Sequence, residues 1–167
     1  MALISNGAFV EDSWRRLADE EALPKSGKVI VSLSRLETAL ASREADAPLG
    51  VIAPNTTSPE ALRSALPKLA LIAVQFPAFS DGRGFSLASL LRRAGFTGEL
   101  RASGRVVADQ YLHALGCGFD TIEIPDDLAQ RHIEAHWRKA LGARSLSYQR
   151  GNRTGVSILE RRRRGAL

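Results

Sequence analysis

Residues 76–119 read FPAFSDGRGFSLASLLRRAGFTGELRASGRVVADQYLHALGCGF, and this stretch decides the fold. An apolar segment runs into a glycine-rich loop, which is followed by an amphipathic helix, a second apolar segment and a second helix. The same alternation continues on both sides of the stretch. Strands that alternate with helices at this spacing predict βαβ units and a parallel sheet.

Working outward, short apolar runs bounded by polar or glycine-containing turns predict five strands. These strands are expected over residues 28–33, 49–53, 69–75, 99–102 and 120–124. Capping residues and apolar stripes predict a helix after each strand. The helices are expected over 34–43, from 58 onward, over 86–95, over 107–115 and, as one long helix, over 126–141.

We therefore predict a single α/β domain with an open, mostly parallel sheet of about five strands and flanking helices. The alternative is a curved sheet like half of a TIM barrel, since five units are too few for the complete barrel. Residues 1–27 carry little periodic signal and are interpreted as an N-terminal extension. Residues 28–149 are expected to form the domain, with a last extended segment at 145–149, and residues 150–167 a basic, disordered tail.

Composition argues against several classes of protein. The net charge is +5, but Arg161 to Arg164 supply four of these charges, so the rest of the chain is nearly neutral. A nucleic-acid-binding face is therefore not expected, and the arginine run is a solvated tail by default. One cysteine, Cys117, excludes a disulfide framework within the chain. Neither a secretory signal nor a membrane-spanning run is evident, which favours a cytoplasmic protein.

Ligands of open α/β sheets bind outside the carboxyl ends of the strands. That rule selects polar residues from the predicted strand exits for one shared edge, namely Asp81, Arg83, Arg101, Arg105 and Glu123. A homodimer formed through a sheet edge is compatible with a chain of this size.

The segment Asp81-Gly82-Arg83-Gly84 has a physical logic for binding a small oxyanion. Its glycines let backbone N–H groups approach a ligand, and the following helix presents a positive dipole end. Arg83 adds a planar fork that suits carboxylate, phosphate or sulfur oxyanions. The opposing interpretation is a tight turn with a solvated arginine. The segment lacks the lysine of a Walker A loop.

Other chemistry-bearing residues give weaker signals. Asp109 and Gln110 sit in the first turn of a predicted helix, where capping competes with a role as a base or as a partner of an arginine. Cys117 is expected to be a small packing residue rather than a nucleophile. His132 and His136 are expected on an exposed face of one helix, and no third ligand accompanies them, so no metal site is predicted.

The ordered motifs FPAFSDGRGFSLASLLR, GFTGELRASGRVVADQ, CGFDTIEI and LSYQ resemble a bacterial family of unknown function, DUF934. The likeness spans residues 9–149. Members of the family are commonly encoded beside the assimilatory sulfite reductase haemoprotein. The positions that match are Asp81, Gly82, Arg83, Gly84, Arg101, Gly104, Asp109, Gln110, Gly118, Phe119 and Asp120.

The resemblance implies a cytoplasmic accessory protein of sulfate assimilation that acts with sulfite reductase. It implies neither a reaction nor a cofactor, and whether the protein is an enzyme stays open. The family tends to have an acid where Arg105 stands and a base where Ala108 stands, so no mechanism is built on either. The alternative function is a small oxidoreductase or oxyanion-binding enzyme at the strand ends, with Arg83, Arg101 and Asp109 as its residues.

Overall fold

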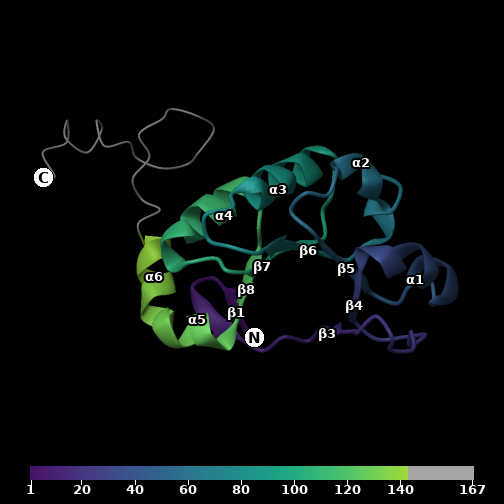
Figure 1. The fold of residues 1–167 in the computed structure, drawn as a ribbon, viewed down its shortest axis with the longest axis horizontal. Helices are drawn as coiled ribbons and strands as arrows, with labels where there is room; N and C mark the ends of the chain where they lie inside the picture. The colour runs from purple at the N-terminus through teal and green to yellow at the C-terminus, as the bar shows by residue number, and fades with distance from the viewer. Residues whose placement is uncertain (143–167) are drawn as a thin grey trace, which may run out of the picture.

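The computed structural model describes residues 1–142. These residues form one curled sheet with helices packed along its outer face (Figure 1). The strands in chain order are β1 (Ala2–Ser5), β2 (Ala8–Val10), β3 (Arg15–Arg16), β4 (Val29–Ser32), β5 (Leu49–Ala53), β6 (Leu71–Phe76), β7 (Glu99–Gly104) and β8 (Thr121–Ile124). The helices are α1 (Leu36–Ser42), α2 (Pro59–Leu62), α3 (Arg83–Arg93), α4 (Tyr111–Cys117), α5 (Asp126–Arg131) and α6 (Glu134–Gly142).

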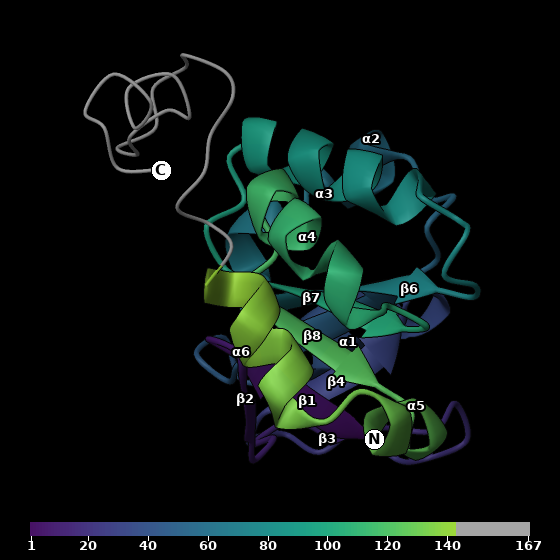
Figure 2. The ribbon, with the colours of Figure 1, turned by 90° about the vertical axis from the view of Figure 1, so that its left-hand side faces the viewer.

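The strands lie in the order β2-β1-β8-β7-β6-β5-β4-β3. Strands β3 to β8 run parallel, whereas β1 pairs antiparallel with β8 and β2 pairs antiparallel with β1. The sheet arches with the helices on its convex side, and Figure 2 shows α3 and α4 next to each other above the strands. The half-barrel that was the alternative prediction is therefore the fold. Its outermost strands are β2 and β3, and dimerisation through either one stays a prediction.

Side chains alternate between the two faces of the sheet, as strand geometry requires. On β6, Ile72, Val74 and Phe76 join the main core beneath the helices. Leu71 and Ala73 point to the concave face, where they form a second, smaller core with Ile30, Trp14 and Ile52. Curvature brings the concave side chains close together: a Cβ at Gly50 would lie 3.1 Å from Ile30 and 3.2 Å from Leu71.

Residues 11–17, which we call the strap, cross the open side of the arch from β2 to β3 (Figure 1). No strand is predicted from the sequence of residues 1–27, yet β1, β2 and β3 all lie there and belong to the same sheet as the rest. Strands β1 and β2 form a hairpin whose turn is Asn6-Gly7, both with positive φ (49° and 78°). Asn-Gly is the preferred dipeptide for such a two-residue turn. Tyr111 Oη accepts a hydrogen bond from the Gly7 N–H (3.0 Å), which ties the turn to α4.

Several predicted helices differ from the observed ones; those predicted from 34 and from 107 begin with 3-10 turns, at Leu33–Arg35 and Ala108–Gln110. Helix α3 begins at Arg83 rather than Ser86, because Gly82 takes the N-cap position and the Asp81 carboxylate accepts the Arg83 backbone N–H (3.3 Å). The long helix predicted over residues 126–141 is broken into α5 and α6. At the break the His132 carbonyl accepts the indole N–H of the fully buried Trp137 (2.9 Å). The predicted segment 145–149 and the tail 150–167 lie outside the described residues.

Candidate functional site

The carboxyl ends of β6, β7 and β8 and the loops that follow them hold most of the predicted site residues. The first group is Arg83 with Asp81, in the loop between β6 and α3. The Arg83 guanidinium donates to both Asp81 oxygens, at 2.9 and 2.6 Å. These bonds, and next the Asn55 amide, hold the pKa of the Asp81 carboxyl well below its usual range, and Asp81 raises the pKa of Arg83. Arg83 is nevertheless 62% exposed and faces solvent.

Asn55, which follows β5, is the buried member of this group. It is only 8% exposed, and it helps to lower the pKa of Asp81. Its Nδ2 makes no hydrogen bond of ordinary geometry to any of residues 1–142. The buried Asn55 amide places an N–H donor next to the Asp81 carboxylate. It therefore stabilises the charged form of Asp81, which in turn binds the exposed Arg83.

Two glycines near this loop, Gly84 and Gly104, are required by close packing against Phe76. Gly84 is buried in the first turn of α3, where a Cβ would come within 2.4 Å of the Phe76 ring. Gly104 at the end of β7 has φ of +126°, and a Cβ there would lie 2.4 Å from the Phe76 carbonyl oxygen. A Cβ at Gly82 would meet its first heavy atom, on Phe85, at 3.8 Å, which is ordinary contact. Close packing around Phe76 therefore explains Gly84 and Gly104.

Phe79 projects from the same loop and is 63% exposed, a high value for a phenylalanine. Gln110 Nε2 donates to the Phe79 carbonyl (2.8 Å), and Gln110 Oε1 accepts the Val107 backbone N–H (3.2 Å). Gln110 thus bridges the β6–α3 loop and the 3-10 turn that precedes α4. Phe79 and Arg83 are both presented to solvent by backbone that is anchored from below, and we call this pair with its loop the β6–α3 surface.

Arg101 does not reach the predicted shared edge. It points to the concave face in the first half of β7 and is only 1% exposed. Its guanidinium binds Asp12 of the strap (2.5 and 3.1 Å) and Glu99 (3.1 and 3.2 Å), while Thr121 donates to Glu99 (2.7 Å). Burial alone would lower the pKa of Arg101 and raise that of Asp12, but their mutual hydrogen bonds and charges reverse both directions. Arg101 joins strap to sheet and is separate from Arg83.

Glu123 does lie at the edge, with a partner that sequence reasoning missed. Arg16 of β3 reaches across the concave face and donates through Nη2 to Glu123 Oε2 (2.6 Å) and Ser103 Oγ (3.2 Å). Glu123 and Ser103 are each 5% exposed. The segment around Arg16 has no periodic pattern, and the contact joins residues 107 positions apart. No local signal in the sequence could have identified it.

Arg105 of the predicted edge and the nearby Asp109 make no side-chain hydrogen bond or ion pair with these groups. Arg105 lies 3.6 Å from Asp127 of α5, and both side chains are about half exposed. Asp109 lies in the first turn of the 3-10 helix before α4, is exposed, and makes no hydrogen bond or ion pair with any of residues 1–142. The β6–α3 surface is therefore the best-ordered group of exposed side chains that we identify on the helix side of the edge.

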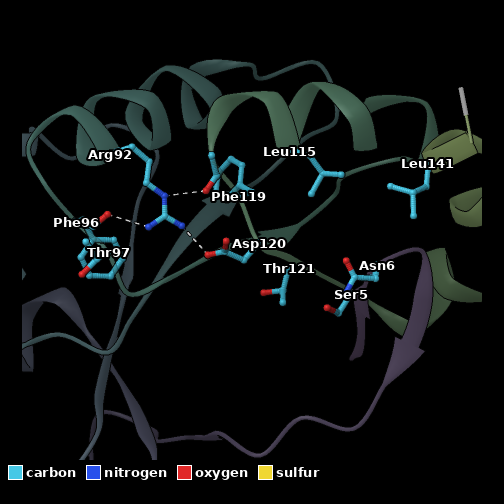
Figure 3. A pocket seen from close by; sticks show the side chains of 11 residues that line it. Ser5, Asn6, Arg92, Phe96, Thr97, Leu115, Phe119, Asp120, Thr121 and Leu141 are labelled. Atoms are coloured by element: carbon cyan, nitrogen blue, oxygen red, sulfur yellow. Dashed lines mark hydrogen bonds and ion pairs between the residues drawn. The ribbon is translucent and has the colours of Figure 1, made fainter. Parts of the chain in front are cut away.

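Asp120 lies at the opposite edge of the sheet, beside a cavity of about 760 Å³ (Figure 3). Its carboxylate binds Arg92 (2.6 Å) and the Leu100 N–H (2.8 Å). Arg92 also donates to the carbonyls of Gly118, Phe96 and Gly98, at 3.0, 2.9 and 2.8 Å. This arginine clamps two loops onto α3. The cavity's strongest polar groups are thus already occupied by structural bonds.

The histidines and the cysteine form no metal centre. His132 and His136 stack edge to face with centroids 5.9 Å apart, across the break between α5 and α6 and not on one helix. Cys117 Sγ lies 3.7 Å from His113 Nε2 near the surface of α4. Among residues 1–142, no group of three or more His, Cys, Asp or Glu side chains could hold a metal ion.

Comparison with known proteins identifies the family of the chain. The model of a bacterial protein family of unknown function, DUF934, matches residues 50–158, more than half of the chain. The chain belongs to the DUF934 family. The match covers β5 to α6, including the β6–α3 surface, Ser103 and Glu123, but not the strap. No curated protein matches the chain. None of the helices within residues 1–142 has the length and apolar character needed to cross a bilayer.

Proposed function

We propose that this DUF934 protein is a cytoplasmic accessory protein of assimilatory sulfite reduction that binds sulfite reductase through the β6–α3 surface. The observation that carries the proposal is the exposed pair Phe79 and Arg83 on an anchored loop. Aromatic residues and arginine are enriched among the side chains that dominate binding energy in protein interfaces. The choice of sulfite reductase as the partner rests on the family resemblance given above.

The loop is built to bind without a large ordering cost. Gln110 fixes the Phe79 carbonyl, and Asp81 fixes the Arg83 guanidinium with two hydrogen bonds. Side chains and loops that are ordered before binding lose less conformational entropy when a partner arrives. Arg83 retains its exposed Nη1, which can form a charge-assisted hydrogen bond with a partner carboxylate. A protein surface with one apolar anchor and one neighbouring acid would complement this pair.

The test is a titration of purified sulfite reductase haemoprotein with this protein, followed by calorimetry. We expect measurable binding that Phe79→Ala weakens by at least tenfold, about 1.4 kcal/mol. Arg83→Ala should weaken it as well. The matched control is Arg63→Ala, because Arg63, just after α2, is 70% exposed and makes an ion pair with Glu60 (3.0 Å). No binding, or binding equally sensitive to Arg63 and Arg83, would refute the proposal.

The alternative, an oxyanion-binding enzyme at the strand ends, is favoured by the exposure of Arg83 at the start of the 11-residue helix α3. Its set of residues would be smaller than the sequence indicated, because Arg101 is buried against Asp12 and Glu99. Thermal-shift measurements with sulfite, sulfate, phosphate, flavins and nicotinamide nucleotides test it, since a ligand of the native state raises the melting temperature. No shift with any of them would count against this function.

A further inference from the structure

The concave face of the half-barrel opens to solvent at the carboxyl ends of its strands. Along β6, the concave residues Leu71 and Ala73 are fully buried, whereas the next one, Gln75, is exposed. An exposed side chain on the concave face of a central strand means that the strap and the second core stop short of this end. Any ligand of the concave face would enter here, next to the top of β6.

Strand register aligns three polar side chains across this opening. Gln75 of β6 pairs with Ser103 of β7, and Ser103 pairs with Glu123 of β8. All three lie on the concave face, since their neighbours Val74, Ala102 and Ile122 belong to the main core. We call Gln75, Ser103 and Glu123, together with Arg16, the upper row.

Stability alone does not account for the upper row. Glu123 and Ser103 are each 5% exposed, and their shared partner Arg16 is 39% exposed at its side chain. Bringing the Glu123 carboxylate out of water costs free energy that one attraction to a half-exposed arginine does not fully recover, and apolar replacements of buried ion pairs are often neutral or stabilising. In β4, β5 and β6 other concave positions are apolar, at Ile30, Ile52 and Ala73.

The upper row also keeps unused hydrogen-bonding groups. Arg16 uses only Nη2, and Glu123 accepts only through Oε2. Several other polar groups of the upper row make no hydrogen bond to any of residues 1–142. They are Nη1 and Nε of Arg16, Oε1 of Glu123, the hydroxyl proton of Ser103 and the side-chain amide of Gln75. Donors and acceptors thus alternate over a short distance around one opening.

We propose that the upper row is a binding site for a small uncharged ligand with neighbouring hydroxyl groups, such as a sugar or polyol. A hydroxyl group donates to Glu123 and accepts from Arg16 or Gln75, so it satisfies both kinds of free group at once. The charges of Arg16 and Glu123 cancel at 2.6 Å. A small oxyanion would meet the Glu123 carboxylate, and an ammonium ion would meet the Arg16 guanidinium. The site is distinct from the β6–α3 surface, and its test is independent of sulfite reductase.

The experiment is an NMR titration of the full-length, ¹⁵N-labelled chain with D-ribose, D-glucose and myo-inositol, and separately with sulfate. At least one hydroxylated probe should shift the Gln75 side-chain amide resonances in a saturable manner, and sulfate should not. The amide of Gln130, exposed on α5, is the internal reference that should stay unchanged. The proposal is overturned when none of the three probes gives a saturable shift at Gln75, or when sulfate gives one in the wild type.

Two variants sharpen the result. Ser103→Ala removes one hydroxyl and keeps the bond between Arg16 and Glu123. The variant should fold normally and bind the responding probe at least tenfold more weakly. Glu123→Gln removes the carboxylate that pairs with Arg16, so the variant should no longer bind the hydroxylated probe and should show a sulfate-dependent shift at Gln75. Unchanged affinity in Ser103→Ala would contradict the proposed site even when Glu123→Gln fails to fold.

Discussion

Replacing Gly84 by alanine tests the packing of α3 on the sheet. The new Cβ would lie 2.4, 2.7 and 3.0 Å from three atoms of the Phe76 ring. Carbon atoms that are not bonded pack at about 3.5–4.0 Å. Either the ring or the first turn of α3 must therefore move by about 1 Å.

The ring has little freedom to move. Phe76 is 2% exposed, and its centroid lies 4.9 Å from that of Phe85 and 5.8 Å from that of Phe119. Overpacking of this kind costs roughly 1–3 kcal/mol. Alanine recovers up to about 1 kcal/mol as the better helix former. We expect Gly84→Ala to lose about 1–2 kcal/mol of unfolding free energy, and the melting temperature to fall by roughly 2–8 °C.

Chemical denaturation of both proteins at one pH, with thermal melts beside it, measures the loss. The control is Gly142→Ala at the end of α6, where the new Cβ has no tertiary contact within 4 Å among residues 1–142, so its stability should stay within about 0.5 kcal/mol of wild type. Adding Phe76→Leu to Gly84→Ala should show favourable coupling, because the two residues occupy one space. A Gly84→Ala protein as stable as the wild type would refute the packing argument and restore ligand approach as the reason for this glycine.

Three further variants test the strap, the Arg92 contacts that hold two loops on α3, and the break between α5 and α6. Asp12→Asn should destabilise the fold by less than the roughly 3–5 kcal/mol of a fully unpaired buried charge, because Arg101 keeps Glu99. The folded state lowers the pKa of Asp12, so the carboxylate stabilises the fold above its unfolded pKa, and this stabilisation is lost as pH falls through the folded pKa. In urea titrations, the difference in unfolding free energy between wild type and Asp12→Asn should therefore shrink below about pH 4. Arg92→Ala removes three carbonyl bonds and the Asp120 pair, and denaturation should show a loss of about 2–4 kcal/mol. Trp137→Phe keeps most of the packing but leaves the His132 carbonyl unpaired, and should lose about 1–2 kcal/mol in the same assay; an unchanged midpoint would contradict the role of that bond.

Strand and helix order from β4 to β8 could be predicted because each element is long enough to show its own pattern. Apolar runs such as Leu71–Phe76 carry the signal of a central parallel strand. The strands before residue 17 have only two to four residues, too few for an alternating pattern to stand out. Asn6-Gly7 was the one usable signal for the first hairpin. Curvature depends on small concave residues such as Gly50, whose effect appears only once the neighbouring strands are in place.

The candidate site could be predicted only in part, because the rule of strand ends does not say which face a side chain takes. Glu123 does lie at the edge, and Arg83 is exposed in the loop that leaves it. Arg101 lies two residues before Ser103 on the same face, and so deeper in the half-barrel, where the strap covers it. Asp12 and Arg16, which contact the sheet from 89 and 107 residues away, have no local pattern that marks them.

The strap explains how half a barrel can be stable with one sheet. In a complete barrel, side chains from all strands fill the interior. Here the strap supplies the missing wall: Trp14 packs on the second core, Asp12 binds Arg101, and Arg16 binds Glu123. The family match begins at residue 50, so the strap lies outside it together with β1, β2 and β4. Loss of the strap should therefore expose Arg101 and the second core together, and a chain shortened to begin at β4 should fail to fold cooperatively in a calorimetric melt.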